Sequence, residues 1–498
     1  MSSSHPFLPE HRTLIMQIPR IARFRSAADL REHCHSLGAP IPLDDAVLSA
    51  AEGSPLAEPI DIGGRQVGNR WCIHPMEGWD ATSEGLPTDT LLRRWRHFGT
   101  SGAKFIWGGE AVAVLAEGRA NPNQLCGPVC GRAGFAALLD ALRTAHRESC
   151  GTTDDLLVAL QLTHSGRFSK PTPAGRRPRI AYHHPLLDAR HGVDPADSGC
   201  VLTDDDVERL IDAYVAAARD AAAAGFEMVD LKACHGYLIH EFLSARRRPG
   251  RFGGDFAGRT RLLRTLIERV RAECPGTLIG VRLSLFDTVP WHKVDDHGEP
   301  FPYAAHLPYD CGFGVDAADP LAIDLAEPIR LLELLRDLGV ASVNLSAGSP
   351  YTVPHIQRPA AFPPSDGYPP PENPLMGVWR QIEAAARAKA AVPELVMVGS
   401  GYTYLQDYLP HAAQAVVRAG WIDVVGLGRM VLSYPNLPAD TLAGRTLART
   451  SICRTFSDCT TAPRNGLRSG CYPLDDYYKR LEPEASQVKA IKAAIGRG

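Results

Sequence analysis

The sequence predicts an α/β protein built on a closed (β/α)8 barrel, the TIM barrel. From about residue 70 onward, eight short apolar runs alternate with amphipathic stretches of helical periodicity. The runs are apolar on both faces, which is typical of parallel strands covered by helices. Eight strand–helix units are the number that closes such a barrel.

The eight expected strands follow one another at regular intervals. The helix expected at 203–224 shows the pattern between them, with Thr203 as N-cap, aspartates in the first turn and Gly225 at the end. A doubly wound open sheet is the alternative, but it normally has a glycine-rich turn after its first strand. No GxGxxG occurs in the sequence. The runs are "RWCIHPM", "AKFIWGG", "LLVALQLT", "FEMVDLK", "LIGVRLSL", "VASVNLS", "ELVMVGS" and "IDVVGLG".

Several segments fall outside the repeat. Residues 1–55 form a polar N-terminal extension, 56–445 the barrel, and 446–498 a C-terminal appendage with its own cysteines. Residues 288–322 are inserted after the fifth strand, and 348–373 form a proline-rich loop after the sixth. Because both insertions leave from the C-terminal ends of strands, we expect them to overhang the catalytic face as lids or substrate walls.

Composition narrows the class of protein. Of 498 residues, 45% are apolar, which is enough for a large core. The formal charge of −3 gives no sign of nucleic-acid or membrane binding. No run resembles a signal peptide or a bilayer span, and the twelve cysteines are scattered rather than packed into a disulfide framework. These features predict a cytoplasmic enzyme with reduced thiols; whether it is a homo-oligomer is left open.

Polar side chains and glycines gather at the C-terminal end of nearly every expected strand, where the active sites of such barrels lie. In the stretch "DLKACHGYLIHEFLS" an ammonium, an imidazole and a phenol follow the fourth strand within six residues. Because polar residues or glycines end so many of the strands, we expect an active site at this end of the barrel. In strand order the residues are Pro75, Met76 and Glu77; Gly109; Gln161; Lys232, His235 and Tyr237; Arg282; Asn344 and Ser346; Ser400 and Gly401; Gly428 and Arg429.

The ends of the last two strands suggest a phosphate site. Glycines with free backbone N–H groups next to the guanidinium of Arg429 match the phosphate cradle common in these barrels. The alternative is that the glycines only form tight turns and that Arg429 is a surface cation.

Six motifs, in this order and spacing, resemble the old yellow enzyme family of FMN-dependent oxidoreductases. The resemblance covers roughly residues 60–435. It is nearer to the branch of 2,4-dienoyl-CoA reductase and trimethylamine dehydrogenase, but we expect the extra flavin- and nicotinamide-binding domains of that branch to be missing. The motifs are "NRWCIHPM", "QLTHSGR", "HGYLIHEFLS", "RFGGDFAGRTR", "GVRLS" and "VVGLGR".

The resemblance implies that FMN lies across the mouth of the barrel. Pro75 and Met76 would contact the isoalloxazine, and Gln161 would hydrogen-bond its pyrimidine edge. Arg282 would lie near N1 and O2, where a cation stabilises the charge of the reduced flavin. Gln161 could instead be a buried amide satisfied by backbone. The remaining residues expected at the cofactor are Glu77, Gly109, Ser400, Gly401, Gly428 and Arg429, of which the last four would hold the phosphate.

The resemblance also implies roles for the polar cluster after the fourth strand. Lys232 and His235 would bind the activating oxygen of an electron-poor alkene, and hydride would pass from flavin N5 to its β-carbon. Tyr237 would then protonate the α-carbon. The alternative for Tyr237 is a core tyrosine with a solvated hydroxyl.

Two departures from the family pattern put substrate and direction in doubt. Family members usually carry His or Asn where this chain has Lys232, which adds a full charge or a titratable amine. Glu77 stands where Cys or Thr is frequent, beside flavin O4. An ionised carboxylate there would lower the flavin potential unless it is protonated or paired with Lys232.

The C-terminal cysteines resemble part of an iron–sulfur motif. Larger relatives place four cluster-binding cysteines just after the barrel, and the spacing from Cys459 to Cys471 matches theirs. Upstream there is only Cys453, without a CxxC. A [4Fe–4S] cluster ordinarily needs four thiolates, so we expect a degenerate site without a cluster.

Three functions remain in competition. The first is an FMN-dependent ene-reductase in which NAD(P)H and a small-molecule substrate share the pocket over the flavin. The second is a flavin dehydrogenase or demethylase that oxidises a C–N or C–H bond and passes electrons to a carrier. The third, a metal-dependent hydrolase, lacks the His-x-His expected on its first strand.

Overall fold

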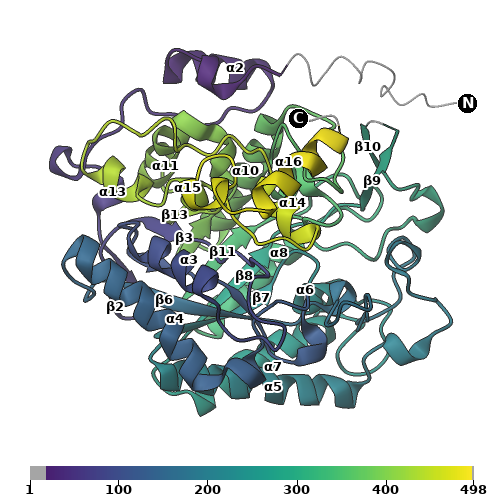
Figure 1. Cartoon of the computed structure of the whole chain (residues 1–498). Coiled ribbons are helices and arrows are strands. Elements are labelled where there is room, and N and C mark those ends of the chain that lie inside the picture. Colours follow the sequence, from purple (N-terminus) through teal and green to yellow (C-terminus); the bar gives the residue numbers. More distant parts are fainter. Residues whose placement is uncertain (1–17, 296, 496–498) are drawn as a thin grey trace, which may run out of the picture.

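The centre of the protein is a closed parallel barrel (Figure 1). The structure is a computed structural model that describes residues 18–295 and 297–495. The last strand pairs with the first, Val425 opposite Trp71 and Leu427 opposite Ile73, which confirms the predicted TIM barrel. The strands are β3 (Trp71–Ile73), β4 (Phe105–Ile106), β5 (Ala111–Ala113), β6 (Leu157–Thr163), β7 (Met228–Ala233), β8 (Leu278–Ser284), β11 (Ser342–Ser346), β12 (Met397–Gly399) and β13 (Val424–Leu427).

The second strand of the barrel is interrupted. β4 and β5 both pair with β6 but are separated by the turn 107–110. Gly108 in this turn has a φ of +120°, a conformation that L side chains rarely adopt. Sequence periodicity located β4 inside the run 103–109 but did not anticipate β5, because glycine and Glu110 separate the two apolar pieces.

Helices surround the barrel. The helix predicted at 203–224 is present as α5, and its capping is as expected. The N–H of Asp206 donates to Thr203 Oγ1 over 3.1 Å, and Gly225 ends the helix in the left-handed region. The longer helices are α3 (Asp89–Gly99), α4 (Gly127–Cys150), α5 (Asp204–Ala224), α7 (Phe256–Glu273), α8 (Ala326–Asp337), α10 (Pro374–Ala391) and α11 (Leu409–Arg418).

A hairpin closes the N-terminal end of the barrel. It consists of β1 (Ile60–Ile62) and β2 (Arg65–Val67), which pair antiparallel. Its buried side chains pack against Phe105, Trp107 and Met228 of the barrel interior. A cavity inside the barrel can therefore open only at the C-terminal ends of the strands.

The chain before the barrel contains a helix that packs on its outside. Leu30 and Cys34 of α2 (Ala27–Ser36) are buried, and Tyr408 donates a hydrogen bond of 2.7 Å to the carbonyl of Phe24. Within residues 18–55 the predicted polar extension is thus attached to the barrel; residues 1–17 lie outside the described part.

The two predicted insertions and the C-terminal appendage contain their own short elements. Figure 1 shows the appendage in yellow beside α10 and β13. Arg93 of α3 forms a two-pronged ion pair of 2.9 Å with Asp475, which ties the appendage to the barrel. The insertions contain β9 (Trp291–Val294), β10 (His297–Pro300) and α9 (Pro354–Gln357), and the appendage α14 (Asp458–Arg464), α15 (Asp476–Lys479) and α16 (Glu484–Ala494).

The connections between these elements contain further short helices. They are α6 (Leu238–Leu243), α12 (Met430–Ser433) and α13 (Leu437–Leu442), with the 3-10 helices η1 (Ile21–Arg23), η2 (Ala50–Glu52), η3 (Pro55–Ala57), η4 (Ala116–Gly118), η5 (Gly166–Phe168), η6 (Ala189–His191), η7 (Ser198–Cys200), η8 (Ala304–His306) and η9 (Tyr402–Tyr408).

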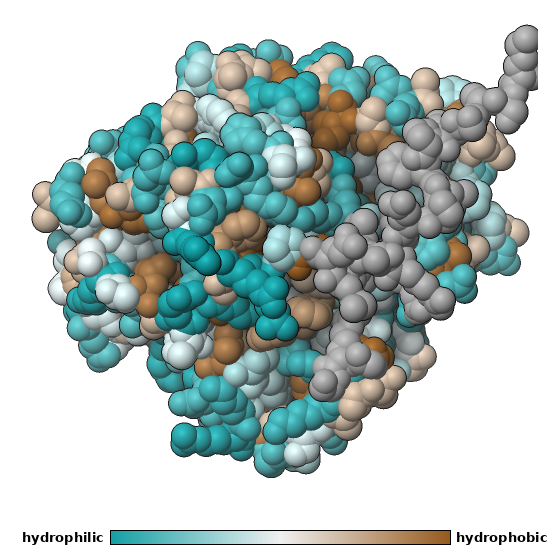
Figure 2. Space-filling model, turned by 90° about the horizontal axis from the view of Figure 1, so that it is seen from above, coloured by the Kyte–Doolittle hydropathy of each residue, from teal (hydrophilic) through white to brown (hydrophobic). Residues whose placement is uncertain are grey.

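Where Figure 2 shows the described residues, hydrophobic residues form small groups scattered among hydrophilic ones. Scattered apolar residues of this kind are ordinary for a protein surface. Among residues 18–295 and 297–495, none of the helices combines the length and apolar character that crossing a bilayer requires.

Candidate active site

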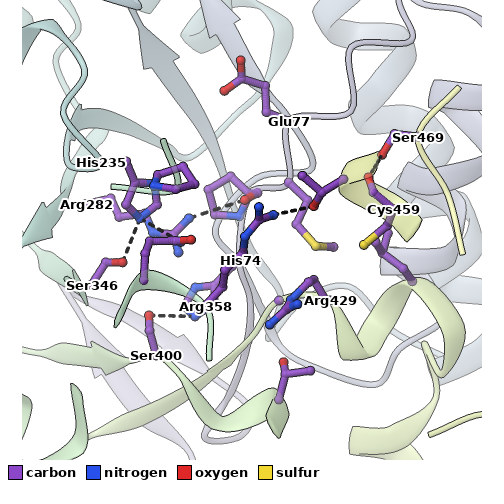
Figure 3. Close-up of a pocket in the computed structure, with 18 of the residues that line it drawn as sticks. His74, Glu77, His235, Arg282, Ser346, Arg358, Ser400, Arg429, Cys459 and Ser469 are labelled. Atoms are coloured by element: carbon purple, nitrogen blue, oxygen red, sulfur yellow. Dashed lines mark hydrogen bonds between the residues drawn. The ribbon is translucent and has the colours of Figure 1, made fainter. Parts of the chain in front are cut away.

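A cavity of about 240 Å³ opens at the C-terminal ends of the barrel strands (Figure 3). It gathers side chains from the ends of β3, β6, β7, β8, β11, β12 and β13, and from the loop 348–373 and the appendage. The predicted residues among its lining are Pro75, Met76, Glu77, Gln161, Lys232, His235, Tyr237, Arg282, Ser346, Ser400, Gly401, Gly428 and Arg429.

Gly109 is not part of this lining. A Cβ atom at this position would lie 2.5 Å from the Trp95 side chain of α3. The absence of a side chain therefore serves the close packing of α3 against the interrupted second strand.

Asp230 holds the floor of the cavity in place from the interior of β7. Its carboxylate accepts a 2.5 Å hydrogen bond from Gln161 Nε2 and one of 2.7 Å from the backbone N–H of Arg282. Burial raises the pKa of Asp230 to about 6, partly offset by these donors. Sequence reasoning did not single out Asp230; an acidic residue inside a buried strand was the available signal.

Arg282 brings a buried cation to the cavity. Its Nη1 donates a long 3.4 Å bond to the carbonyl of Pro75, and its buried Nε has no hydrogen-bond partner among the described residues. An unpaired buried guanidinium is costly unless an anion or acceptor meets it. This end of the site is therefore suited to a ligand that carries or develops negative charge.

Glu77 connects the groups at the end of β7. Its Oε2 accepts from Lys232 Nζ over 3.0 Å and from the Tyr237 hydroxyl over 3.2 Å, and its Oε1 accepts from Trp79 over 2.7 Å. Lys232 Nζ also lies 3.7 Å from the centre of the Tyr237 ring. The two residues that depart from the family pattern thus form an ion pair with each other. The phenol of Tyr237 lies beside that pair.

Burial and nearby charges set the protonation of Tyr237 and His235. Burial, followed by the charge of Glu77, raises the pKa of Tyr237 well above its usual value. Burial, followed by the positive charge of Arg282 and Lys232, lowers the pKa of His235 well below its usual value. At neutral pH the site thus contains a neutral phenol and a neutral imidazole, whose Nε2 lies 2.8 Å from Ser346 Oγ.

Three arginines gather at the other end of the cavity. Figure 3 shows Arg358 and Arg429 on the side away from Glu77, and Arg464 joins them from α14. Burial and the repulsion of Arg464 and Arg429 lower the pKa of Arg358 to about 9. Buried nitrogens of Arg358 (Nη2) and Arg429 (Nη1) lack hydrogen-bond partners among the described residues.

Several lining residues escaped sequence reasoning. His74 bridges Asn344 Nδ2 and Ser400 Oγ, each over 3.0 Å. It lies in the first strand motif, "RWCIHPM", so its place near the C-terminal end of that strand could have been read from the sequence. Tyr351, whose hydroxyl lies 3.1 Å from that of Tyr237, and Arg358 come from the proline-rich loop, where no periodicity indicates which side chains turn inward.

The cysteines of the appendage lie close to one another, and one of them reaches the cavity. Cys459 lines it, while burial and the neighbouring Cys453 and Cys459 raise the pKa of Cys471. In the described ranges, 18–295 and 297–495, no group of three or more His, Cys, Asp or Glu side chains is arranged to hold a metal ion.

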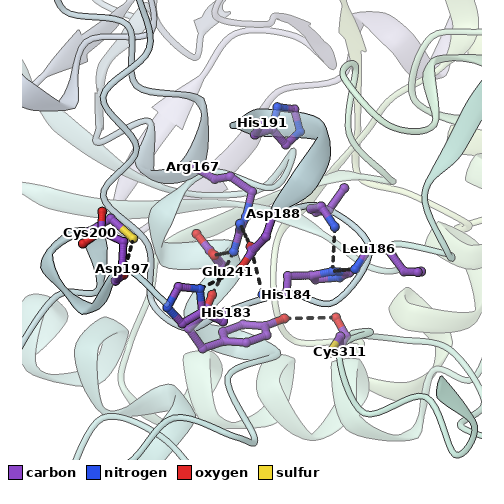
Figure 4. A network of polar contacts seen from close by, with 12 residues as sticks. Arg167, His183, His184, Leu186, Asp188, His191, Asp197, Cys200, Glu241 and Cys311 are labelled. Atoms are coloured by element: carbon purple, nitrogen blue, oxygen red, sulfur yellow. Dashed lines mark hydrogen bonds and ion pairs between the residues drawn. The ribbon is translucent and has the colours of Figure 1, made fainter. Parts of the chain in front are cut away.

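Arg167 of the motif "QLTHSGR" lies outside the catalytic cavity in a separate buried network (Figure 4). It forms ion pairs with Asp188 and, over 2.6 Å, with Glu241, and it donates to the carbonyl of Tyr182. The network joins η5, the following loop and α6, so Arg167 has a structural role in holding these segments together.

The side chains present fit FMN. The unpaired nitrogens of Arg358 and Arg429 can take phosphate oxygens, and a Cβ built on Gly428 would meet nothing within 4 Å, so the backbone there faces open space. Arg282 offers its unpaired Nε on the opposite side. Gln161, held by Asp230, provides a fixed amide for a flat polar ring edge.

Comparison with known proteins agrees with this arrangement. Residues 55–307, half of the chain, match the model of the NADH:flavin oxidoreductase / NADH oxidase family. An NADH:flavin oxidoreductase of Gibberella zeae is 27% identical over 400 residues, covering 76% of this chain and 83% of that protein. Rice 12-oxophytodienoate reductase 1 is 34% identical over 251 residues, but the match covers 48% of this chain and 61% of the rice protein.

Solved structures show the same fold. The old yellow enzyme homologue from Zymomonas mobilis superimposes with a TM-score of 0.54 at 23% identity, covering 79% of this chain and 94% of that one. A 2-naphthoyl-CoA reductase gives a TM-score of 0.62 at 18% identity, covering 86% of this chain and 58% of that one. The chain belongs to the NADH:flavin oxidoreductase or old yellow enzyme family, and is an oxidoreductase with FMN as cofactor and NAD(P)H as reductant.

Proposed function

We propose that the protein reduces the activated C=C bond of an enone, enoate or enoyl thioester at the expense of NAD(P)H. The observation that carries this proposal is the position of Tyr237. Its neutral phenol lines the cavity beside the ion pair of Lys232 and Glu77, with His235 and Arg282 in the same lining. FMN, when bound, would supply hydride to the β-carbon of the alkene.

Lys232 and His235 are the groups that would bind the activating oxygen. As negative charge grows on that oxygen, the ammonium of Lys232 and an N–H of the neutral His235 can each donate a hydrogen bond to it. Lys232 has three donors, so its contact with Glu77 leaves others for a substrate. Ser346 and the backbone bond from His235 N–H to Ser284 Oγ, 3.0 Å long, hold the imidazole in place.

Tyr237 would act as the general acid. Its raised pKa keeps the proton on the phenol until carbanion character develops on the α-carbon. Once the proton has left, the ammonium of Lys232 over the ring would stabilise the phenolate. The Tyr351 hydroxyl, 3.1 Å away, offers a path for reprotonation.

Anaerobic half-reactions test the proposal. NADH or NADPH should bleach the yellow enzyme, and an enone, enoate or nitroalkene should restore the colour with formation of the saturated product. If amines or other C–H donors bleach the flavin while no alkene restores it, the enzyme works in the opposite direction, as a dehydrogenase that passes electrons to a carrier.

A further inference from the structure

A second, basic pocket lies directly behind Tyr351. It has a volume of about 80 Å³ and is defined here by Arg176, Arg190, His191, Tyr351, Asp366 and Arg464. Tyr351 and Arg464 line both this basic pocket and the catalytic cavity. A ligand that extends from the catalytic cavity into the basic pocket would pass the side chain of Tyr351, which contacts Tyr237.

The charges in the basic pocket are not balanced. Asp366 pairs with Arg464, whereas Arg176 and Arg190 form no ion pair with any described residue. Arg190 donates only to backbone carbonyls, that of Trp291 over 2.7 Å and that of Tyr351 over 3.2 Å. Burial, and the repulsion of Arg176 and Arg464, lower the pKa of Arg190. Arg176 and Arg190 both keep exposed surface, so water screens part of their charge, but three arginines around the single carboxylate of Asp366 still favour an anion between them.

A buried histidine adds an unpartnered polar atom. His191 is 5% exposed, and its Nε2 has no hydrogen-bond partner among the described residues. Its Nδ1 faces the guanidinium of Arg176, which can only donate, so Nδ1 accepts and Nε2 carries the proton of the neutral ring. Figure 4 shows no contact between the ring of His191 and the Arg167 network, which His191 joins only through its backbone N–H, a donor to the carbonyl of Asp188.

Aromatic rings connect the basic pocket to the reaction site. His191 packs edge-on against Phe168 with ring centres 5.0 Å apart, and Phe168 stacks on Tyr351 at 4.1 Å. The Tyr351 hydroxyl in turn contacts that of Tyr237. Because Arg190 also binds the Tyr351 carbonyl, an anion held by Arg190 would act on the same loop that positions the phenol.

We infer that the basic pocket binds a carboxylate or phosphate group of a ligand whose reacting part lies in the catalytic cavity. Two ligands could carry that anion: the alkene, as a second acidic group distant from the C=C bond, or NADPH, as its 2′-phosphate. This inference rests on the proposed function for the identity of the alkene, but the anion site itself does not require turnover.

The test uses the FMN-loaded enzyme and the variants Arg176→Gln and Arg190→Gln. Arg177→Gln is the matched control, since Arg177 is exposed like Arg176 but lies outside the basic pocket. Dissociation constants come from perturbation of the flavin spectrum by enones with a terminal carboxylate on chains of increasing length, each compared with its methyl ester. NADPH is compared with NADH in the same way.

A charge-assisted hydrogen bond lost from such a site corresponds to roughly a 10- to 100-fold weaker binding. We expect that loss in both variants for one acid or for NADPH, with the ester or NADH unaffected. A loss confined to the acid assigns the site to the alkene, and one confined to NADPH assigns it to the 2′-phosphate. Equal effects on charged and uncharged ligands, or none, would overturn the inference.

Inorganic phosphate provides a measurement without substrate. It should raise the melting temperature of the wild-type holoenzyme and of Arg177→Gln, and raise it less in Arg176→Gln, whose side chain hydrogen-bonds only to His191 among the described residues. Equal stabilisation of all of them would contradict an anion site. If phosphate binds as expected while no alkene reoxidises the flavin, the proposed function fails and the anion site remains.

Discussion

Two walls of the catalytic cavity differ in origin. One is built by strand ends of the barrel and carries Gln161, Lys232, His235 and Arg282. The other is built by the loop 348–373 and the C-terminal appendage. The first wall is held by buried bonds within the sheet, such as those made by Asp230. The second is held by contacts between segments distant in sequence, such as Arg464 with the carbonyl of Pro350 over 3.1 Å.

The two walls should therefore serve different purposes: the strand ends carry out the reaction, and the loop and appendage determine which ligand binds. Groups on strand ends keep a fixed geometry because the strands on both sides hold them, and such rigidity suits proton donors and oxyanion partners. Loops at the same mouth can change in length and charge without disturbing the barrel. We therefore expect variants of the proton donor and oxyanion partners at the strand ends to affect the rate of the chemical steps. Variants of the cations around the cavity, whether on strand ends or in the loop, should affect binding.

The largest effect should come from the acid on the strand-end wall. Tyr237→Phe removes the proton donor but keeps the ring under Lys232. Reoxidation of reduced flavin by an alkene should slow by about 10²- to 10⁴-fold, the usual contribution of general acid catalysis. Reduction by NAD(P)H should stay near the wild-type rate, since it needs no proton from the phenol. Stopped-flow absorbance separates the two half-reactions.

The matched loop variant is Tyr351→Phe, which removes only the hydroxyl that touches Tyr237. Its effect on reoxidation should be far smaller than that of Tyr237→Phe. If the two variants slowed reoxidation equally, or if Tyr237→Phe slowed both half-reactions alike, Tyr237 would not be the acid.

The second prediction compares a strand-end cation with a loop cation. Arg429→Ala and Arg358→Ala each remove a guanidinium with an unpaired nitrogen at the proposed phosphate site. A charge-assisted hydrogen bond contributes about 1.5–3 kcal/mol, so each change should weaken FMN binding by roughly 10- to 100-fold. The flavin that the denatured protein releases should be FMN rather than FAD.

Equilibrium dialysis against FMN measures both constants. Arg449→Ala, which removes an exposed arginine paired with Asp407 away from the cavity lining, is the control. Wild-type affinity in Arg429→Ala would show that this residue is only a cation beside tight turns. Protein that stays colourless after incubation with FMN would end the whole interpretation.

The third prediction concerns the charge of Glu77. Glu77→Gln keeps the shape of the side chain and one acceptor oxygen, for either Lys232 or Trp79, but removes the negative charge from the flavin site. Reduction of the flavin adds negative charge, so the variant should have a higher potential, by roughly 30 mV if about 1.4 kcal/mol of repulsion is relieved. Spectroelectrochemical titration measures it, with Tyr351→Phe as the control. An unchanged potential would mean that Lys232 already neutralises Glu77 completely.

The same division explains what the sequence could predict. All eight strand regions and the capped helix α5 were predictable, because alternating apolar runs and local caps are properties of short segments. Residues at strand ends, such as Gln161 and Tyr237, could be assigned to one cavity because closure of a parallel barrel brings those ends together.

The loop wall could not be predicted in this way. Arg358 and Tyr351 lie in a proline-rich loop, and Arg464 lies in the appendage beyond the end of the barrel at residue 445, so no periodicity places their side chains. Their positions depend on tertiary contacts, for instance the bond of Arg358 to Thr460 of the appendage. The division of the second strand into β4 and β5 was missed because two glycines and Glu110 interrupt the apolar run, and the sequence does not show that the chain pairs with β6 again beyond them.

The smallest expected effect lies at the end of the loop wall, where the appendage brings Cys453, Cys459 and Cys471 near Arg429. Only these three cysteines belong to the appendage, whereas a [4Fe–4S] cluster ordinarily needs four thiolates, and the described residues hold no group of three or more ligands arranged for a metal ion. Asp458, next in sequence to Cys459, forms an ion pair with Lys492.

We therefore expect assays of anaerobically purified protein to find iron and acid-labile sulfide far below one per chain. The visible spectrum of Cys471→Ser should be that of flavin alone. Near-stoichiometric iron and sulfide, lost in Cys471→Ser, would contradict this and would favour the electron-transferring dehydrogenase over the ene-reductase.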